Sequence, residues 1–273
     1  MNPVTDFRTS MTSLKESDFE AVRDLAKTTC GIELHHGKRA LVSSRLERLV
    51  RIHGFHSFTD YIQFVALRKH SPEFTEFIDT LTTNFSGFWR EPEHFTFLNK
   101  TIFQERRESL KIWSAACATG EEPYTLAMCA LSAGVQNCRI AASDISTVAL
   151  KTALRGEYDE TRLAALPMGW KERYLTRVQQ DGATVASVSA QVRSIVSFIP
   201  LNLLQPFGHV GYFDVIFCRN VMIYFEQSTR DRLVDRLLDQ LTPGGLFFTG
   251  HSESLLRIPP GLEYIQPATY RKL

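Results

Sequence analysis

Trp113-Ser-Ala-Ala-Cys-Ala-Thr-Gly-Glu-Glu-Pro-Tyr124 is the stretch that decides the fold of this 273-residue chain. A short apolar run, 110–113, leads into it, and an apolar helical segment, 124–131, follows it. A strand, a tight turn of small residues and a helix start are together typical of a nucleotide-binding βα junction. The stretch therefore predicts a Rossmann-like domain.

The same turn indicates the kind of ligand. It has a single glycine, Gly120, and no lysine, so it is not a phosphate-cradling P-loop. Glu121 and Glu122 stand at the helix start, where they stabilise the helix but would repel a pyrophosphate. We therefore expect a nucleoside that carries positive charge rather than phosphates, and S-adenosylmethionine is such a molecule.

Strands and helices alternate after about residue 107. Apolar runs stand at 110–113, 138–142, 213–218 and 245–249, separated by helical patterns at 122–135, 146–155 and 227–241. This alternation favours a parallel sheet with helices on both faces. The tract 176–199 interrupts it, because it is rich in β-branched residues and contains the hairpin-turn signal Asp181-Gly182. We expect a small antiparallel β insertion there.

The N-terminal part reads as helical throughout. Ser17-x-x-Glu20 resembles a capping box, a second helix is expected from about Gly37 to His53, and further helices open at Ser57 and at Ser71-Pro72. We therefore assign 1–85 to an all-α N-terminal domain. Residues 86–273 form the Rossmann-like domain, with the β insertion at about 176–199.

Composition excludes several classes of protein. The balance of 31 basic and 30 acidic residues gives no overall attraction to nucleic acid. No stretch is apolar enough to span a bilayer, so no membrane insertion is expected. The five cysteines form no CxxC pair and read as reduced thiols of a cytoplasmic protein. The histidines show no metal-ligand spacing, so we expect no metal site.

Polar residues follow two of the predicted strands. Asp144 ends the second strand, where an acid can accept hydrogen bonds from both ribose hydroxyls; the alternative role is the N-cap of the helix at 146. Arg219, Asn220 and Tyr224 follow Phe213–Cys218 and are expected to face the ligand cleft. The alternative makes Tyr224 a core aromatic and Arg219 a surface cation.

A third cluster, Thr83-Asn-Phe-Ser-Gly-Phe-Trp-Arg90, precedes the α/β region and would by itself be a linker. Together the clusters resemble the CheR family of chemotaxis receptor methyltransferases. The strings Thr119–Tyr124 and Cys218–Phe225 are long and specific. The other matching segments are Thr83–Glu91, His94-Phe95, Ala142–Ile145, Asn202–Leu204, Gly250–Glu253 and Thr269-Tyr270.

The resemblance implies a class I, S-adenosylmethionine-dependent protein-glutamate O-methyltransferase, whose product is S-adenosylhomocysteine. The positions it implies as cofactor contacts are Asn84, Ser86, Arg90, Glu122, Asp144, Asn202, Leu203, Arg219 and Asn220. Arg90 and Tyr224 are implied to lie near the transferring methyl and are the catalytic candidates. Two residues depart from the family pattern: Ser86 replaces a more usual Thr, and Cys117 stands where Ala or Ser is commoner.

The expected chemistry needs no general base, because a glutamate carboxylate with an ordinary pKa of about 4.3 is already a nucleophile at neutral pH. The protein must align oxygen, methyl and sulfur and exclude water. We expect Tyr224 to donate a hydrogen bond or to pack near the methyl, and Arg90 to hold a carboxylate. That carboxylate belongs either to the cofactor or to the substrate.

Partner surfaces follow from the same resemblance. The second helix carries cations (Lys38, Arg45, Arg48 and Arg51) beside an apolar side (Val42, Leu46, Leu49 and Val50). Such a charge run is either a solvated face or, as the family implies, the surface that docks on the Glu-rich methylation helices of a chemoreceptor. In some family members the small β subdomain binds a peptide from the receptor C-terminus by strand addition.

Two other functions compete with this one. A methyltransferase acting on amide or amine nitrogen needs a polar-Pro-Pro-aromatic turn, and the segment 220–224 has neither proline. A signalling module that senses S-adenosylmethionine without transferring methyl is the alternative from another class. The presence of Arg90 and Tyr224 argues against it.

Overall fold

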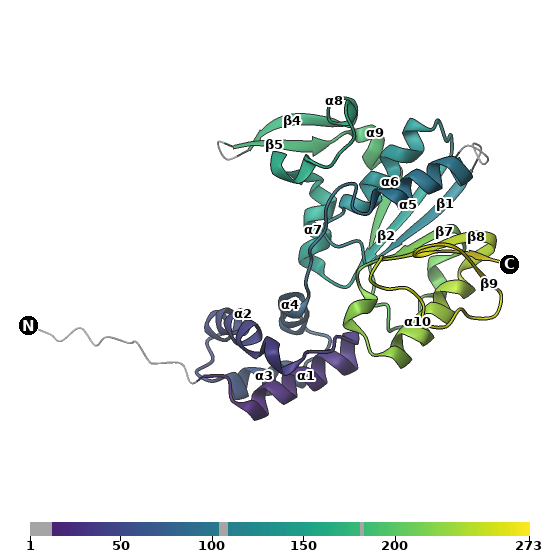
Figure 1. Ribbon diagram of the computed structural model, residues 1–273. Helices are drawn as coiled ribbons and strands as arrows, with labels where there is room; N and C mark the ends of the chain where they lie inside the picture. The colour runs from purple at the N-terminus through teal and green to yellow at the C-terminus, as the bar shows by residue number, and fades with distance from the viewer. Residues whose placement is uncertain (1–12, 104–108, 181–182) are drawn as a thin grey trace, which may run out of the picture. The chain divides into compact units, whose positions relative to one another are not determined.

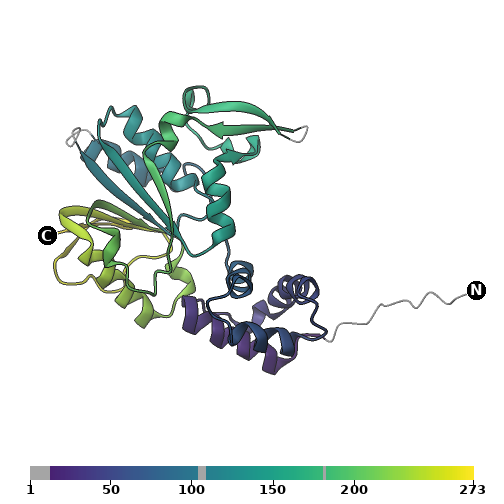
Figure 2. The same ribbon diagram turned by 180° about the vertical axis from the view of Figure 1, so that it is seen from behind.

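The computed structural model describes residues 13–103, 109–180 and 183–273, so the predicted turn Asp181-Gly182 lies outside the described residues. The chain divides into two compact units, Met1–Thr82 and Thr83–Leu273. Figures 1 and 2 show helices alone in the first unit and a large sheet with helices in the second. None of the described helices is both long and apolar enough to cross a bilayer.

Within residues 13–82, the described part of the N-terminal unit, there are four helices: α1 Glu16–Cys30, α2 Arg39–Ile52, α3 Phe58–Ala66 and α4 Pro72–Leu81, with a 3-10 turn, η1 His36–Lys38, before α2. Ser57 caps α3 by accepting a hydrogen bond from the Asp60 amide at 3.1 Å, and Ser71 caps α4 in the same way, as predicted. The capping box predicted at Ser17 is wrong. Ser17 lies inside α1, and Asp18 accepts a hydrogen bond from the Lys15 amide instead.

The core of this unit consists of apolar side chains from all four helices. Phe19, Leu46, Tyr61 and Phe77 are fully buried, one from each helix. Burial of each such side chain contributes roughly 1.5–3 kcal/mol. The predicted apolar face of α4, from Phe74 to Leu81, packs into this core. The all-α N-terminal domain is therefore confirmed.

The second unit is built on a seven-stranded sheet in the order β6-β2-β1-β7-β8-β10-β9. Its strands are β1 Leu110–Ala115, β2 Cys138–Asp144, β6 Val196–Pro200, β7 Phe213–Cys218, β8 Leu241–Thr249, β9 Leu262–Gln266 and β10 Thr269–Lys272. The first five in spatial order pair in parallel, whereas β10 is antiparallel to β8 and to β9. The sequence predicted four of these five parallel strands, but it predicted neither the place of β6 in this sheet nor the C-terminal hairpin.

Alternate residues of the strands face two different cores. Val215 and Phe217 pack with α5 Pro92–Leu98 and α6 Glu121–Ser132, whereas Ile216 packs with α10 Gln227–Asp239. Figure 1 shows α5 and α6 on one face of the sheet and α10 on the other. On β2, Ala142 packs against Leu150 of α7 Thr147–Arg155. Because both faces are covered, the strands read as continuous apolar runs.

The order of the strands locates the ligand site. From β1 the chain moves outward through β2 to β6, and it then returns to the other side of β1 with β7 and β8. In open α/β sheets, ligands bind outside the carboxyl ends of the strands where the order reverses. That point lies here between β1 and β7.

The β insertion exists, but its predicted bounds are wrong at both ends. The small antiparallel sheet has the order β3-β5-β4, with β3 Glu157–Tyr158, β4 Leu175–Gln180 and β5 Ala183–Val188. Val196–Pro200 pairs in parallel with β2 and belongs to the main sheet. Its β-branched residues signal a strand but not the partner of that strand. Short helical pieces complete the unit: η2 Asn99–Phe103, η3 Glu160–Leu163, α8 Trp170–Tyr174, α9 Ala190–Arg193, η4 Gly208–Val210 and η5 Met222–Tyr224.

Candidate functional site at the carboxyl ends of the strands

The turn between β1 and α6 is held in a strained backbone conformation. Ala116 and Ala118 have φ values of 64° and 47°, in the left-handed region that side chains disfavour. Gly120 has φ 94°, and a Cβ there would lie 2.7 Å from the Cβ of Ala153. Non-glycine residues in this region cost about 1–3 kcal/mol each and cluster at functional sites. The strained turn is therefore a candidate ligand-binding feature of this edge of the sheet.

Asp144 holds this turn against the end of β2. One carboxylate oxygen accepts a hydrogen bond from the Ala118 amide and the other from the Ser146 amide, both at 2.8 Å. Ser146, not Asp144, caps α7, because its hydroxyl accepts from the Ala149 amide at 3.1 Å. The alternative in which Asp144 is the N-cap is therefore wrong. Asn84 also reaches this place and donates to the Ser146 hydroxyl at 3.0 Å.

Glu122 and Arg219 form a buried ion pair between the start of α6 and the end of β7. The guanidinium lies 2.9 Å from the Glu122 carboxylate, which also accepts a hydrogen bond from the Ser114 hydroxyl at 2.7 Å. Burial raises the pKa of Glu122 even though Arg219 and Ser114 act in the opposite direction. Arg219 is thus not the surface cation of the alternative interpretation.

The guanidinium of Arg219 also contacts the segment before α5. It donates to the carbonyl of Arg90 at 2.6 Å and lies 2.9 Å from the carboxylate of Glu91. Burial opposes ionisation of Glu91, but Arg219 and Asn220 outweigh it, and the pKa of Glu91 falls below its ordinary value. The side chain of Arg219 is 1% exposed. Its contacts make it a residue that positions the strand ends, in addition to the predicted cofactor contact.

Glu253 fixes the backbone around Asn220. Its carboxylate accepts hydrogen bonds from the amides of Asn220 (2.5 Å), Gly250 (2.9 Å) and Ile223 (3.0 Å). Asn220 is in the left-handed region with φ 60°, and its side chain donates to Glu91 at 3.2 Å. Glu253 was not among the predicted site residues, although it lies in the Gly250–Glu253 segment that matched the family.

The catalytic candidates Arg90 and Tyr224 lie next to these hydrogen-bonded and ion-paired residues in the chain. The backbone of Arg90 is fixed by Arg219, and its side chain donates to the carbonyl of Phe85 at 3.3 Å and lies 5.4 Å from the centre of that ring. The Phe85 side chain is 76% exposed. Tyr224 ends the 3-10 turn after β7 and is half-buried, so it is not a fully buried core aromatic.

The segment after β6 is fixed to β2. The Leu201 amide donates to the carbonyl of Asp144 at 2.9 Å. Asn202 accepts a hydrogen bond from the Leu204 amide at 2.9 Å, and Leu203 is buried. The structure thus places these predicted contacts beside Asp144.

A second buried acid, Glu121, fixes the turn between β1 and α6. Glu121 is fully buried, accepts a hydrogen bond from the Thr119 hydroxyl at 2.8 Å and pairs with Arg162. Arg162 also donates to the carbonyl of Ser86 at 3.4 Å. The structural role of Glu121 was missed because its partner comes from the insertion, far along the chain.

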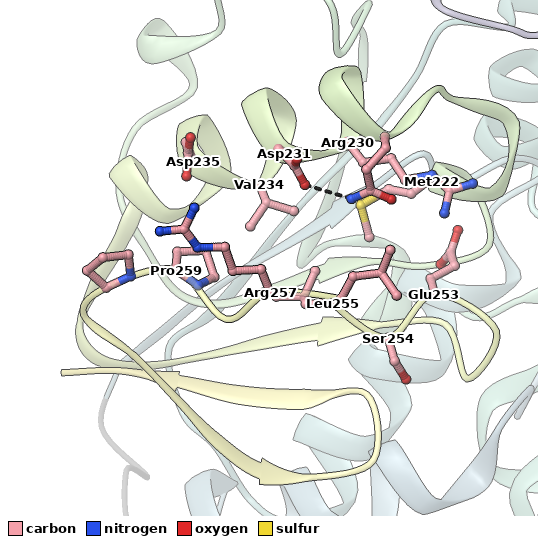
Figure 3. A pocket seen from close by; sticks show the side chains of 13 residues that line it. Met222, Arg230, Asp231, Val234, Asp235, Glu253, Ser254, Leu255, Arg257 and Pro259 are labelled. Carbon is pink, nitrogen blue, oxygen red and sulfur yellow. Dashed lines mark hydrogen bonds between the residues drawn. The ribbon is translucent and has the colours of Figure 1, made fainter.

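A groove of about 270 Å³ lies between α10 and the segment 253–260 (Figure 3). Figure 3 shows Arg230, Asp231 and Val234 on its helical side, and Leu255 and Arg257 on the other. None of the predicted cofactor contacts lines it. The groove adjoins the strand-end site through Glu253, which lines it and also accepts from the Asn220 amide.

The four cations predicted for docking differ in their surroundings. Lys38 belongs to the 3-10 turn and not to α2. Arg45 points inward and donates to the carbonyls of Thr80 and Thr82, both at 3.1 Å, at the end of α4. Arg51 pairs with Glu47 on the surface, and Arg48 is exposed. Arg48 and Arg51 are thus the solvent-facing pair.

Comparison with known proteins gives the family. The model described as the all-alpha domain of CheR methyltransferases matches 17–82, and that described as their SAM binding domain matches 84–270. A chemotaxis protein methyltransferase of Borreliella burgdorferi is 39% identical over 256 residues, which is 89% of each chain. Chemotaxis protein methyltransferase 2 of Pseudomonas aeruginosa is 40% identical, over 88% of this chain and 87% of that protein.

S-adenosylmethionine, which the single-glycine turn predicted, is the cofactor that the matching family domain binds. The acceptors at the strand ends fit it, because Asp144 and Glu122 are carboxylates and suit ribose hydroxyls and positive charge better than phosphates. The fold, the site and both family matches agree, and this chain belongs to the CheR methyltransferase family.

Proposed function

We propose that this chain methylates glutamate side chains of chemoreceptors, giving glutamate methyl esters. The observation that carries this is the similarity, over nine-tenths of the chain, to proteins named chemotaxis protein methyltransferase. The substrate is the cytoplasmic helical region of a receptor. The alternative of a sensor without transferase activity has no observation in its favour.

The cofactor lies across the strand ends in this proposal. Asp144 accepts from the ribose, and Asn84, Ser86, Asn202 and Leu203 line the site around it. Glu122, Arg219 and Asn220 contribute mainly by holding the backbone of the cofactor site in place. Their side chains already bind one another or Glu91.

Bound S-adenosylmethionine supplies an electrophilic methyl on a sulfonium sulfur, and the ester C–O bond forms as the S–C bond breaks. The attacking glutamate carboxylate is ionised at neutral pH, so the protein needs no general base. What this chain's residues contribute is alignment and exclusion of water. The ion pairs of Arg219 with Glu91 and Glu122 suit alignment, because none of these three side chains can rotate without losing an ion pair.

Arg90 is the residue proposed to hold a carboxylate, and Tyr224 to position the reacting oxygen. Within the described part of the chain, the side chain of Arg90 makes one hydrogen bond, to the Phe85 carbonyl, and a cation–π contact with the exposed Phe85 ring. Such weak contacts leave a guanidinium available for a bidentate carboxylate pair. Arg90→Lys keeps the positive charge but loses the planar guanidinium that can bind a carboxylate through two hydrogen bonds. The variant therefore separates the contribution of charge from that of bidentate geometry.

Docking on the receptor is assigned to the solvent-facing pair, Arg48 and Arg51. An acidic, Glu-rich helix would complement them. Arg45 supports this surface indirectly by tying α2 to the end of α4. A receptor C-terminal peptide has a separate place in this proposal: β4 is an edge strand of the small sheet and can accept an added strand.

A methyl-transfer assay with a receptor cytoplasmic fragment and labelled cofactor tests the function. We expect base-labile label on receptor glutamates, a strong loss with Arg90→Ala and partial activity with Arg90→Lys. Exposed Arg139→Ala, on β2, is the matched control and should behave as wild type. Cofactor binding without incorporation into any of several receptors would refute the proposal and support the sensor.

A further inference from the structure

A histidine-rich cluster lies next to the strand-end site and is not used by the proposed chemistry. Glu91, His94 and His251 each bring one possible ligand atom, and these three atoms lie within 4.8 Å of one another. The local spacing of the histidines predicted no metal site. Glu91-x-x-His94 at the start of α5 meets His251, after β8, only through the fold.

His94 is the unusual member of this cluster. Its side chain is fully buried, and neither ring nitrogen makes a hydrogen bond of good geometry within the described part of the chain. It packs between aromatic rings, 5.4 Å from Phe248 and 4.8 Å from His251, centre to centre. Its polar neighbours include the Pro267 backbone and the Glu91 carboxylate, 3.6 Å from Nδ1, and a buried polar group that is only weakly satisfied costs up to about 1–3 kcal/mol. A ligand that accepts the imidazole lone pair would remove that cost.

The separations of the ligand atoms suit a small divalent metal. The Nδ1 atom of His94 lies 3.6 Å from the Glu91 carboxylate. Two ligands at about 2.0–2.1 Å in a tetrahedral zinc site are separated by roughly 3.3–3.5 Å, so this pair needs almost no adjustment. His251 is exposed and can rotate to close the remaining distance. Its exposure also provides a path from solvent.

We propose that Glu91, His94 and His251 form a binding site for a divalent transition metal of the zinc class. Two imidazoles and one carboxylate, with one position open to water, are a ligand set typical of zinc. Hard cations such as Mg²⁺ prefer oxygen ligands and are excluded by this set.

The site is coupled to the strand ends through Glu91. The carboxylate of Glu91 also binds Arg219 at 2.9 Å and the Asn220 side chain at 3.2 Å. A metal ion bound to Glu91 competes with Arg219 for the carboxylate. Metal binding therefore weakens the contacts of Glu91 with Arg219 and Asn220 next to the cofactor site. This consequence rests on the proposed cofactor site and predicts that metal lowers the affinity for S-adenosylhomocysteine.

Cobalt titration of the chelator-treated full chain tests the site, because Co²⁺ replaces Zn²⁺ and is visible by its absorption. We expect one equivalent to bind, with displacement by Zn²⁺, and at least a tenfold loss of affinity in His251→Ala. The control is His36→Ala, which disrupts the other grouping of this kind, exposed Glu16 and His36 with half-buried Glu20. This variant should bind cobalt as wild type does.

Equal binding by wild type and His251→Ala, loss of binding in His36→Ala alone, or no saturable binding would each overturn the metal site. Calorimetry with S-adenosylhomocysteine, with and without Zn²⁺, measures the coupling. Unchanged affinity at saturating zinc would refute the coupling. Failure of S-adenosylhomocysteine to bind the metal-free protein would instead contradict the proposed function.

Discussion

The carboxyl ends of β1 and β7 meet at the same edge of the sheet but are held there by different means. After β1 the chain is shaped by backbone strain, with Ala116 and Ala118 in the left-handed region and the turn bound to Asp144. After β7 it is held by buried charges, with Arg219 between two carboxylates and Glu253 on three amides. The first side is local in sequence, and the second is assembled from distant segments.

This difference teaches where each side is vulnerable. We expect a substitution of one side chain in the strained turn to change the free energy of unfolding only a little, because several backbone contacts hold the turn. A buried ion pair is different, since removal of one partner leaves the other charged and desolvated. We therefore expect the largest mutational effects at β7.

Arg219→Leu should have the largest effect. It leaves the largely buried Glu122 and Glu91, 14% and 16% exposed, without their counter-charge, and breaking a buried pair in this way costs up to about 3–5 kcal/mol. Urea unfolding followed by circular dichroism measures the loss. Arg139→Leu, at an exposed position of β2, is the control and should change stability by about 0.5 kcal/mol or less. A loss of less than about 1 kcal/mol in the free energy of unfolding of Arg219→Leu would contradict the importance of the Arg219 ion pairs.

Asp144→Asn tests the β1 side and should act on binding more than on folding. The amide keeps one oxygen for the Ala118 amide but loses the charge, and hydrogen bonds to a charged group contribute about 1.5–3 kcal/mol. We expect S-adenosylhomocysteine to bind about 10- to 100-fold more weakly by calorimetry. Asp239→Asn, exposed on α10, should bind normally. Unchanged affinity in Asp144→Asn would remove the ribose role.

Glu122 gives a pH dependence of definite sign. Burial, opposed by Arg219, raises the pKa of Glu122 in the folded protein. A carboxylate with a raised pKa contributes stability below its unfolded value, near 4.3, that is lost as the pH rises through its folded pKa. Glu122→Gln cannot ionise. We expect wild type to lose stability relative to Glu122→Gln as the pH rises from 4 to 7, measured by urea unfolding at each pH.

The difference between the two sides also explains what the sequence could predict. The stretch 113–124 predicted the turn, the helix and the cofactor because its information is local. The ion pair of Arg219 with Glu122 joins residues 97 apart, and Asn220 contacts Glu91 from 129 residues away. Arg219 was expected beside the cofactor as a contact, but no spacing indicated its partners. The meeting of His94 with Glu91 and His251 was missed for the same reason.

The sheet shows the same limit. The central strands were predicted because both faces are buried, and their apolar runs are continuous. Val196–Pro200 was assigned to the insertion because its β-branched residues continue those of the preceding tract. As a partly buried edge strand beside β2 it lacks the continuous apolar run of the central strands. The hairpin of β9 and β10 was missed because Leu262–Gln266 is largely exposed and lacks a strong apolar pattern.

Ala116→Gly should have the smallest effect and the opposite sign. Glycine removes the left-handed strain at φ 64°, but it also increases the conformational entropy of the unfolded chain by a comparable amount. We expect a net change below about 1 kcal/mol, on the stabilising side, in the same urea assay. Ala149→Gly, inside α7, is the control and should destabilise by about 1 kcal/mol because no strain is relieved there. Equal destabilisation in both variants would mean that the turn stores no strain, and both strand ends would then depend on side-chain contacts alone.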